Sequence, residues 1–180
     1  MKKVWRLLVV AGLCAQCAWA SGIAGYGSYW KTKDQGDGFG GGAKLKLDLI
    51  PQLSLEVRGT YFDNLADKDK WGDGKLQVIP VEGDLVVNLT IAEKLIPYIG
   101  GGAGYYFMDG KDPDGNKVDI KDEVGAFAVA GLEIEIGEEV ALFAEAKYTW
   151  LQIKEVEKVE LDTAQKLDGF GANAGLMLKW

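Results

Sequence analysis

The chain has 180 residues, enough for a single domain, and carries 27 acidic against 20 basic residues for a formal net charge of −7. Such an acidic chain excludes functions that depend on attraction to nucleic-acid phosphates. Histidine is absent, which removes the usual general base of enzymes and the commonest metal ligand in proteins.

The first twenty residues have the three parts of a secretory signal peptide. A start with three basic residues precedes an apolar segment at residues 7–13, and the small-x-small cleavage site Ala18-Trp19-Ala20 follows. The apolar segment is too short to span a bilayer comfortably. We therefore predict a signal peptide over residues 1–20 and one domain over residues 21–180. Cleavage removes three cations and no acids, so the formal charge of the domain becomes −10.

Both cysteines, Cys14 and Cys17, lie inside the predicted signal peptide. The domain therefore has no cysteine, and disulfides cannot hold its fold in an oxidising compartment. Lipidation of one cysteine is an alternative to cleavage after Ala20. It is disfavoured because Leu13 and Gln16, rather than small residues, precede the two cysteines.

Alternation of apolar and polar residues with period two recurs along the domain and predicts strands. In one segment Leu45, Leu47 and Leu49 alternate with charged residues, a pattern that places all three leucines on one face of a strand. The pattern does not assign the faces of the glycine-rich first segment. The eight predicted strands cover residues 22–31, 43–49, 53–61, 79–89, 97–108, 124–136, 142–150 and 170–180.

The predicted connections alternate between long and short. Long ones cover residues 32–39, 63–74, 109–122 and 154–166, and short ones cover residues 50–52, 92–94 and 137–139. Outer-membrane barrels have long extracellular loops and short periplasmic turns, so this order places both termini on the periplasmic side. We expect aromatic residues of the strands to form two belts at the membrane interfaces. One belt lies near the long connections and contains Tyr61, Phe107, Trp150 and Phe170. The other lies at the opposite end of the strands and contains Trp180.

Period two alone does not decide which face of the strands is outside. In a soluble sandwich or lipocalin the charged face meets water, whereas in an outer-membrane barrel the apolar face meets lipid and the charged face fills the lumen. The signal peptide and the connection lengths favour the second arrangement, because a chain with no second long apolar run can cross a membrane only as a closed barrel. The predicted lumenal charge network consists of Lys44, Lys46, Asp48, Glu56, Arg58, Glu82, Asp84, Glu133, Glu135, Glu145 and Lys147.

Strand register follows from the turn lengths and the shared outward face. The three-residue turn at residues 50–52 places Lys46 opposite Glu56. The same rule places Asp84 opposite Gly102 and Glu82 opposite a second glycine, Gly104, where small residues leave room for long side chains.

The chain resembles the small eight-stranded outer-membrane β-barrel families of the OmpA/OmpX, OmpW-like and opacity-protein type. The resemblance covers essentially the whole domain and rests on residues 97–105, residues 145–148 and the C-terminal pattern that ends in Trp180. It implies an all-β fold, an eight-stranded antiparallel up-and-down transmembrane β-barrel, in the bacterial outer membrane. It also implies outer-membrane lipid and the barrel-insertion machinery as partners. The insertion machinery is expected to read an assembly signal that consists of Asn173, Gly175, Leu178 and Trp180.

Neither the residues nor the resemblance points to one activity, because such barrels serve as envelope elements, adhesins, solute conduits and lipid enzymes. We predict no cofactor, no metal site and no catalytic residues. The acidic run at residues 112–116 is better explained as a Pro-Asp-Gly turn than as a calcium loop. We expect a structural or surface role in envelope integrity or adhesion, with no enzymatic activity and no periplasmic domain after the barrel. The alternatives are a narrow conduit for small or hydrophobic solutes and, third, a lipid-modifying barrel enzyme that uses carboxylate pairs such as Glu133 and Glu135.

Overall fold

The computed structural model describes residues 21–33, 36–65, 75–89, 91–92, 94–111, 117–118, 122–156 and 159–180. The predicted signal peptide at residues 1–20 and the predicted turn at residues 112–116 lie outside these ranges. No helix within them combines the length and the apolar character needed to cross a membrane.

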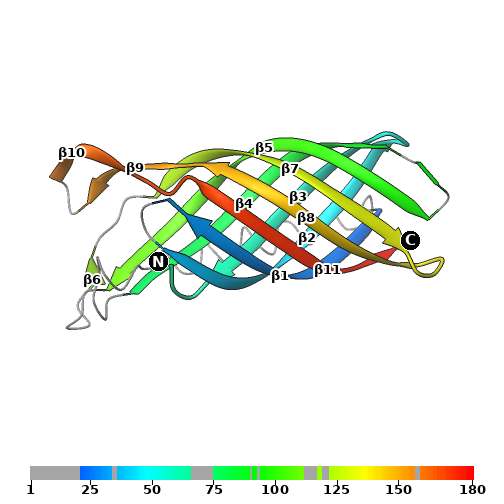
Figure 1. Ribbon diagram of the computed structural model, residues 1–180, viewed down its shortest axis with the longest axis horizontal. Coiled ribbons are helices and arrows are strands. Elements are labelled where there is room, and N and C mark those ends of the chain that lie inside the picture. The colour runs from blue at the N-terminus through cyan, green and yellow to red at the C-terminus, as the bar shows by residue number, and fades with distance from the viewer. Residues whose placement is uncertain are drawn as a thin grey trace, which may run out of the picture.

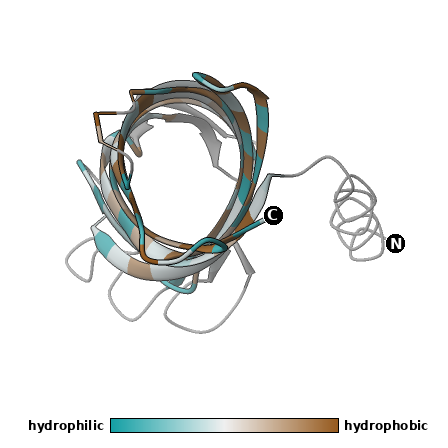
Figure 2. Ribbon diagram, turned by 90° about the vertical axis from the view of Figure 1, so that its right-hand side faces the viewer, coloured by the Kyte–Doolittle hydropathy of each residue, from teal (hydrophilic) through white to brown (hydrophobic). Residues whose placement is uncertain are grey.

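Eight long strands in the described part of the chain close into an antiparallel barrel, as predicted (Figures 1 and 2). Each strand pairs with the long strands before and after it in sequence, and β1 pairs with β11 to close the ring. Closure leaves no long strand with an open backbone edge. The strands are β1 (Gly22–Thr32), β2 (Asp37–Ile50), β3 (Leu53–Phe62), β4 (Lys75–Asn88), β5 (Leu95–Lys111), β7 (Glu123–Glu135), β8 (Val140–Trp150) and β11 (Gly169–Lys179).

The register agrees with the prediction. Lys46 lies opposite Glu56 in the β2–β3 ladder, and Asp84 lies opposite Gly102 in the β4–β5 ladder. The barrel has a long-connection end, where β1, β3, β5 and β8 finish, and a short-connection end, where β2, β4, β7 and β11 finish.

The structure is more regular at the long-connection end than the sequence pattern indicates. Strand β4 begins at Lys75 and β5 continues to Lys111, where it pairs with the short strand β6 (Lys117–Val118). The predicted connection at residues 154–166 is wrong in detail, because it contains most of the hairpin β9 (Gln152–Val156) and β10 (Val159–Lys166), which projects beyond the barrel in Figure 1. The start of β4 was not predicted because its inward residues, such as Leu76 and Val78, are apolar and do not alternate with apolar outward residues as charged ones would.

Side chains alternate between the inside and the outside of the barrel along each long strand. The structure assigns the faces of β1, whose Ala24, Tyr26 and Trp30 are buried inside. Large apolar side chains point outward, and the most exposed include Phe170 at 68% and Trp180 at 63%. The outside of the barrel is therefore the more apolar face, the reverse of a soluble protein.

Aromatic side chains form a rim around the outer face at the long-connection end. The predicted residues Tyr61, Phe107, Trp150 and Phe170 lie on this face. Phe107, Trp150 and Phe170 each contact a neighbouring ring that the prediction did not name, and Tyr29 and Phe39 form a further pair on the rim. The ring-centroid distances are 4.8 Å for Tyr105–Phe107, 4.9 Å for Tyr148–Trp150, 4.7 Å for Tyr148–Phe170 and 5.1 Å for Tyr29–Phe39.

Candidate functional site

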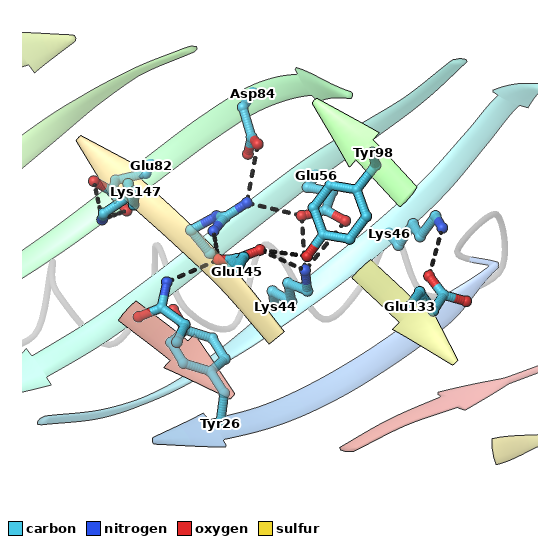
Figure 3. Close-up of polar contacts among 12 residues, drawn as sticks. Tyr26, Lys44, Lys46, Glu56, Glu82, Asp84, Tyr98, Glu133, Glu145 and Lys147 are labelled. Carbon is cyan, nitrogen blue, oxygen red and sulfur yellow. Dashed lines mark hydrogen bonds and ion pairs between the residues drawn. The ribbon is translucent and has the colours of Figure 1, made fainter. Parts of the chain in front are cut away.

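The centre of the barrel interior holds a cluster of ion pairs around Arg58, a fully buried side chain of β3. Its Nη2 atom donates hydrogen bonds to Glu56 at 2.8 Å and to Asp84 at 2.9 Å, and its Nη1 atom donates to Glu145 of β8 (Figure 3). Strands β3 and β8 lie four strands apart in both directions around the ring. The Arg58–Glu145 pair therefore joins opposite walls of the barrel.

Among the described residues, Glu145 is the acceptor at which the most strands meet. Besides Arg58, it accepts hydrogen bonds from Lys44 of β2 at 3.3 Å, Tyr98 of β5 at 2.7 Å and Asn173 of β11 at 2.8 Å. The Lys44 ammonium also bonds Glu56 and lies 4.1 Å from the ring centroid of Phe143. Charge-assisted hydrogen bonds of this kind are stronger than neutral ones, and here they tie five strands together.

A second ion pair lies toward the long-connection end. Lys147 of β8 bonds both carboxylate oxygens of Glu82 of β4, at 2.7 and 2.8 Å, and the Tyr106 hydroxyl donates to the same carboxylate at 2.6 Å. Side chains from two strands, β8 and β5, therefore satisfy one buried acid of a third strand, β4, as burial of a charge requires.

A third group lies near the short-connection end. Lys46 of β2 bonds Glu133 of β7 at 2.9 Å, again across opposite walls of the ring. Lys179 of β11 bonds the other oxygen of Glu133 at 2.9 Å and also bonds Glu135 at 2.5 Å.

Most predicted members of the charge network lie buried inside the barrel, but two lie at its rim. Asp48 is exposed near the end of β2 and accepts a hydrogen bond from the Ser54 hydroxyl at 2.6 Å. Glu135 near the end of β7 has a side chain that is 30% exposed. Parity places both residues on the inward face, but the strands end there and water reaches their carboxylates. The buried members are Lys44, Lys46, Glu56, Arg58, Glu82, Asp84, Glu133, Glu145 and Lys147.

Several residues that complete the network were not among those predicted from the sequence. Tyr98 and Tyr106 share the inward face of β5 with its glycines. Their even residue numbers, like those of the glycines, were a signal that could have placed them inside. Lys179 had the same inward parity on the last strand. Tyr26 of β1 exchanges a hydrogen bond with Thr60 at 2.7 Å, and no sequence signal pointed to that pair.

The β5 glycines leave room for the acids of β4, as the register predicts. A Cβ atom added at Gly102 would lie 2.0 Å from the backbone oxygen of Gly83 and 2.6 Å from the Cα of Asp84. One added at Gly104 would lie 2.6 Å from the Cγ of Glu82. The inward face of β5 therefore has no space for a methyl group beside these two carboxylates.

An apolar layer fills the interior between the charges and the long-connection end. The residues predicted to face inward were all charged, so the sequence pattern did not identify this layer. Leu65, Leu151 and Leu167 enter the layer from connections and are fully buried, and the Asp168 carboxylate fixes the chain by accepting the Leu151 N–H at 2.8 Å. The layer consists of Trp30, Phe62, Leu65, Leu76, Val78, Tyr106, Met108, Leu151 and Leu167.

The interior is arranged to brace the barrel walls. Glu56, Glu82 and Glu145 each accept a hydrogen bond from a cation. Tyrosine or asparagine side chains donate further hydrogen bonds to Glu82 and Glu145. In the described ranges, no group of three or more acidic, Cys or His side chains is placed to hold a metal ion.

Comparison with known proteins agrees with this architecture. The family model described as "Outer membrane protein beta-barrel domain" matches residues 7–179. No curated protein matches the chain. Solved structures with the same fold include Neisserial surface protein A (TM-score 0.71, 15% identity, covering 88% of this chain and 96% of that chain) and OprG from Pseudomonas aeruginosa (0.65, 12%, 88% and 94%). A third is Ail, the attachment invasion locus protein of Yersinia pestis (0.52, 16%, 87% and 95%).

Proposed function

Because this chain belongs to the outer membrane protein β-barrel domain family, we propose that it has a structural or surface role in the outer membrane, in envelope integrity or adhesion, and no enzymatic activity. The protein is an integral protein of the bacterial outer membrane, and its outward apolar side chains face lipid. The observation that carries the proposal is the closed interior. Ion pairs between opposite walls and an apolar layer above them occupy the space that a solute would cross.

A surface role is also supported by what projects from the barrel and by the structural relatives. Outer-membrane barrels place their long connections outside the cell, so the β9–β10 hairpin extends into the extracellular space. One relative is named a surface protein and another is named for attachment and invasion. The two names favour a role at the cell surface for this chain.

Conductance separates the structural role from that of a conduit. We expect the purified barrel in planar lipid bilayers to give no steady current, because the Arg58–Glu145 and Lys46–Glu133 pairs cross the bore. A wide porin, whose larger ring leaves an aqueous channel, serves as the positive control in the same bilayers. A steady, ion-selective current from this barrel would contradict the structural proposal.

The second candidate function is a conduit for small or hydrophobic solutes. One observation favours it: within the described part of the chain, the buried Trp30 Nε1–H has no hydrogen-bond partner. An apolar solute with one acceptor atom could satisfy this donor. Uptake of such a solute by vesicles that contain the barrel, above uptake by protein-free vesicles, is the measurement that supports this candidate. The third candidate, a lipid-modifying enzyme, is weakened because Lys179 engages both Glu133 and Glu135.

We also propose the barrel-insertion machinery as a partner that reads the end of β11. Of the four predicted signal residues, Asn173 bonds Glu145 inside the barrel, and a Cβ atom added at Gly175 would lie 2.7 Å from the Cβ of Tyr26. Leu178 and Trp180 are instead 54% and 63% exposed on the outer face. The recognition surface is therefore the outward pair, while the other two residues fit the interior.

Replacing Trp180 with Ala tests this partner. We expect several-fold less barrel in the outer membrane of cells, measured by fractionation and heat-dependent gel migration, because the exposed aromatic end of β11 is lost. Folding of the purified variant into lipid vesicles should change little. Trp150→Ala is the matched control, since Trp150 is also outward and 50% exposed but lies at the other end of the barrel. Equal loss for both variants in cells would argue against recognition at the C-terminus.

A further inference from the structure

The ion pairs inside the barrel leave one carboxylate without a balancing cation. In the described part of the chain they join five cations to six acids. The pair of Lys147 and Glu82 is balanced, and the group near the short-connection end holds two lysines and two glutamates. The central cluster around Arg58 instead holds two cations and three acids. The excess negative charge therefore belongs to the centre of the barrel.

The wall of the barrel around this cluster is described without a gap. The residues outside the described ranges precede β1 or belong to the connections between the long strands. The apolar layer lies between the cluster and the long-connection end, and the Lys46–Glu133 pair lies on the other side of it. The charge count at the centre is thus complete for the strands that form it.

Asp84 is the acid that carries the excess charge. Glu56 and Glu145 each accept hydrogen bonds from both cations of the cluster, Lys44 and Arg58. Asp84 accepts one such bond, from Arg58 to its Oδ2 atom at 2.9 Å (Figure 3). Its other oxygen, Oδ1, is buried and has no hydrogen-bond partner among the described residues. The whole residue is only 2% exposed, so bulk water does not solvate this oxygen.

The surroundings of Asp84 contain no further cation that could balance it. Its ladder neighbours are Glu56 on β3 and Gly102 on β5, and the next acid on its own strand, Glu82, already engages Lys147. An ionised carboxylate without a counter-charge is strongly disfavoured in such a site. A water molecule would satisfy Oδ1 but would leave the charge in place. The other charged and titratable groups nearby, among the described residues, are Tyr26, Lys44, Arg58, Tyr98 and Glu145.

We propose that the central cluster binds one small monovalent cation, a proton or an alkali-metal ion, at the Oδ1 atom of Asp84. With this cation bound, the cluster has equal numbers of positive and negative charges. A proton from water would add to a lone pair of Oδ1 and would break no bond in the protein. The close approach of β4 and β5 at Gly102 favours the proton, which needs no additional volume. The ion-pair brace of the barrel is thereby linked to the pH or the salt of the medium, whether or not the interior conducts.

Two series of urea titrations distinguish the two cations. The purified protein is folded in phosphatidylcholine vesicles, and its folding equilibrium constant is measured by tryptophan fluorescence. The chain has no histidine, so few ordinary side chains titrate between about pH 6 and about pH 9. If a proton is bound, the folded state holds one proton more than the unfolded state. The folding constant then falls as the pH rises, by up to about tenfold for each pH unit.

The second series replaces sodium chloride with choline chloride at constant pH and ionic strength. If an alkali ion is bound, the folding constant falls by up to about tenfold for each tenfold decrease in sodium concentration. Choline is too large to enter the interior, so it keeps the ionic strength without replacing the bound ion.

Three variants locate the site. Asp84→Asn leaves two cations and two acids in the cluster, so we expect its folding constant to be unchanged in both series. Glu56→Gln reaches the same balance from β3 and should behave alike, so the test does not depend on one variant folding. Asp48→Asn is the matched control, because it makes the same substitution at an exposed inward-parity position of β2. This control should keep the wild-type dependence.

The series in which the wild-type protein and Asp48→Asn respond identifies the cation. A wild-type folding constant that stays the same in both series would overturn the proposal and leave only a water molecule at Oδ1. The same dependence in Asp84→Asn would also overturn it, as would dependence retained in Glu56→Gln, whose cluster has no excess charge. Conductance plays no part in these measurements, so their failure is separate from failure of the proposed structural role.

Discussion

Replacing Arg58 with Met will lower the free energy of unfolding by about 3–5 kcal/mol, the usual cost of removing one partner of a buried ion pair. Arg58 bonds Glu56, Asp84 and Glu145, and the only other cation in this cluster of described residues is Lys44. The variant therefore leaves three buried carboxylates against one ammonium. Urea titration of the barrel in lipid vesicles, followed by tryptophan fluorescence, measures the loss.

The same charge count predicts partial rescue by a second substitution. Glu145→Gln alone leaves two cations and two anions in the cluster, so it should cost less than Arg58→Met. The double variant has the same net charge in the cluster as the wild-type protein, with one excess carboxylate. We expect its loss to be smaller than the sum of the two single losses by about 1–3 kcal/mol. Simple additivity would show that charge balance does not control the stability of this cluster.

Replacing Gly102 with Ala will destabilise the barrel by about 1–3 kcal/mol, the cost of forcing atoms into a packed site. The new methyl group would overlap the Gly83 backbone oxygen at 2.0 Å and the Cα of Asp84 at 2.6 Å. Because both contacts belong to β4, relief requires the β4–β5 ladder to separate locally. Asp84 would then move away from Arg58, which it now meets at 2.9 Å.

Gly59→Ala is the control for this substitution. An added Cβ atom there meets no heavy atom within 4 Å, so it should change stability by no more than about 0.5 kcal/mol. The comparison uses the same urea titration for both variants. If Gly102→Ala were as stable as Gly59→Ala, strands β4 and β5 could not lie as close together at Asp84 as the structure places them.

The sequence alone determined the positions of the eight long strands, the two faces of all of them except β1, and the register of the β2–β3 and β4–β5 ladders. Side chains alternate with period two, so the leucines beside Lys44 and Lys46 must share one face of β2. The short turn after Ile50 then leaves one register in which the inward faces of β2 and β3 agree. These are local constraints, which neighbouring residues and short connections impose. The alternation lost its signal in the glycine-rich β1 and where the inward residues were apolar, as at Leu76 and Val78.

The pairing of the charges was decided only by the tertiary structure. Lys46 lies opposite Glu56 in the ladder, yet its ammonium bonds Glu133 on the far wall, while Lys44 and Arg58 engage Glu56. Ladder partners are set by adjacent strands, but a long side chain that points into a narrow ring reaches strands far away in sequence. Closure also placed Asp48 in water at a strand end and brought leucines from separate connections into one apolar layer. Distances across a closed cylinder depend on its circumference and tilt, which no local pattern in the chain encodes.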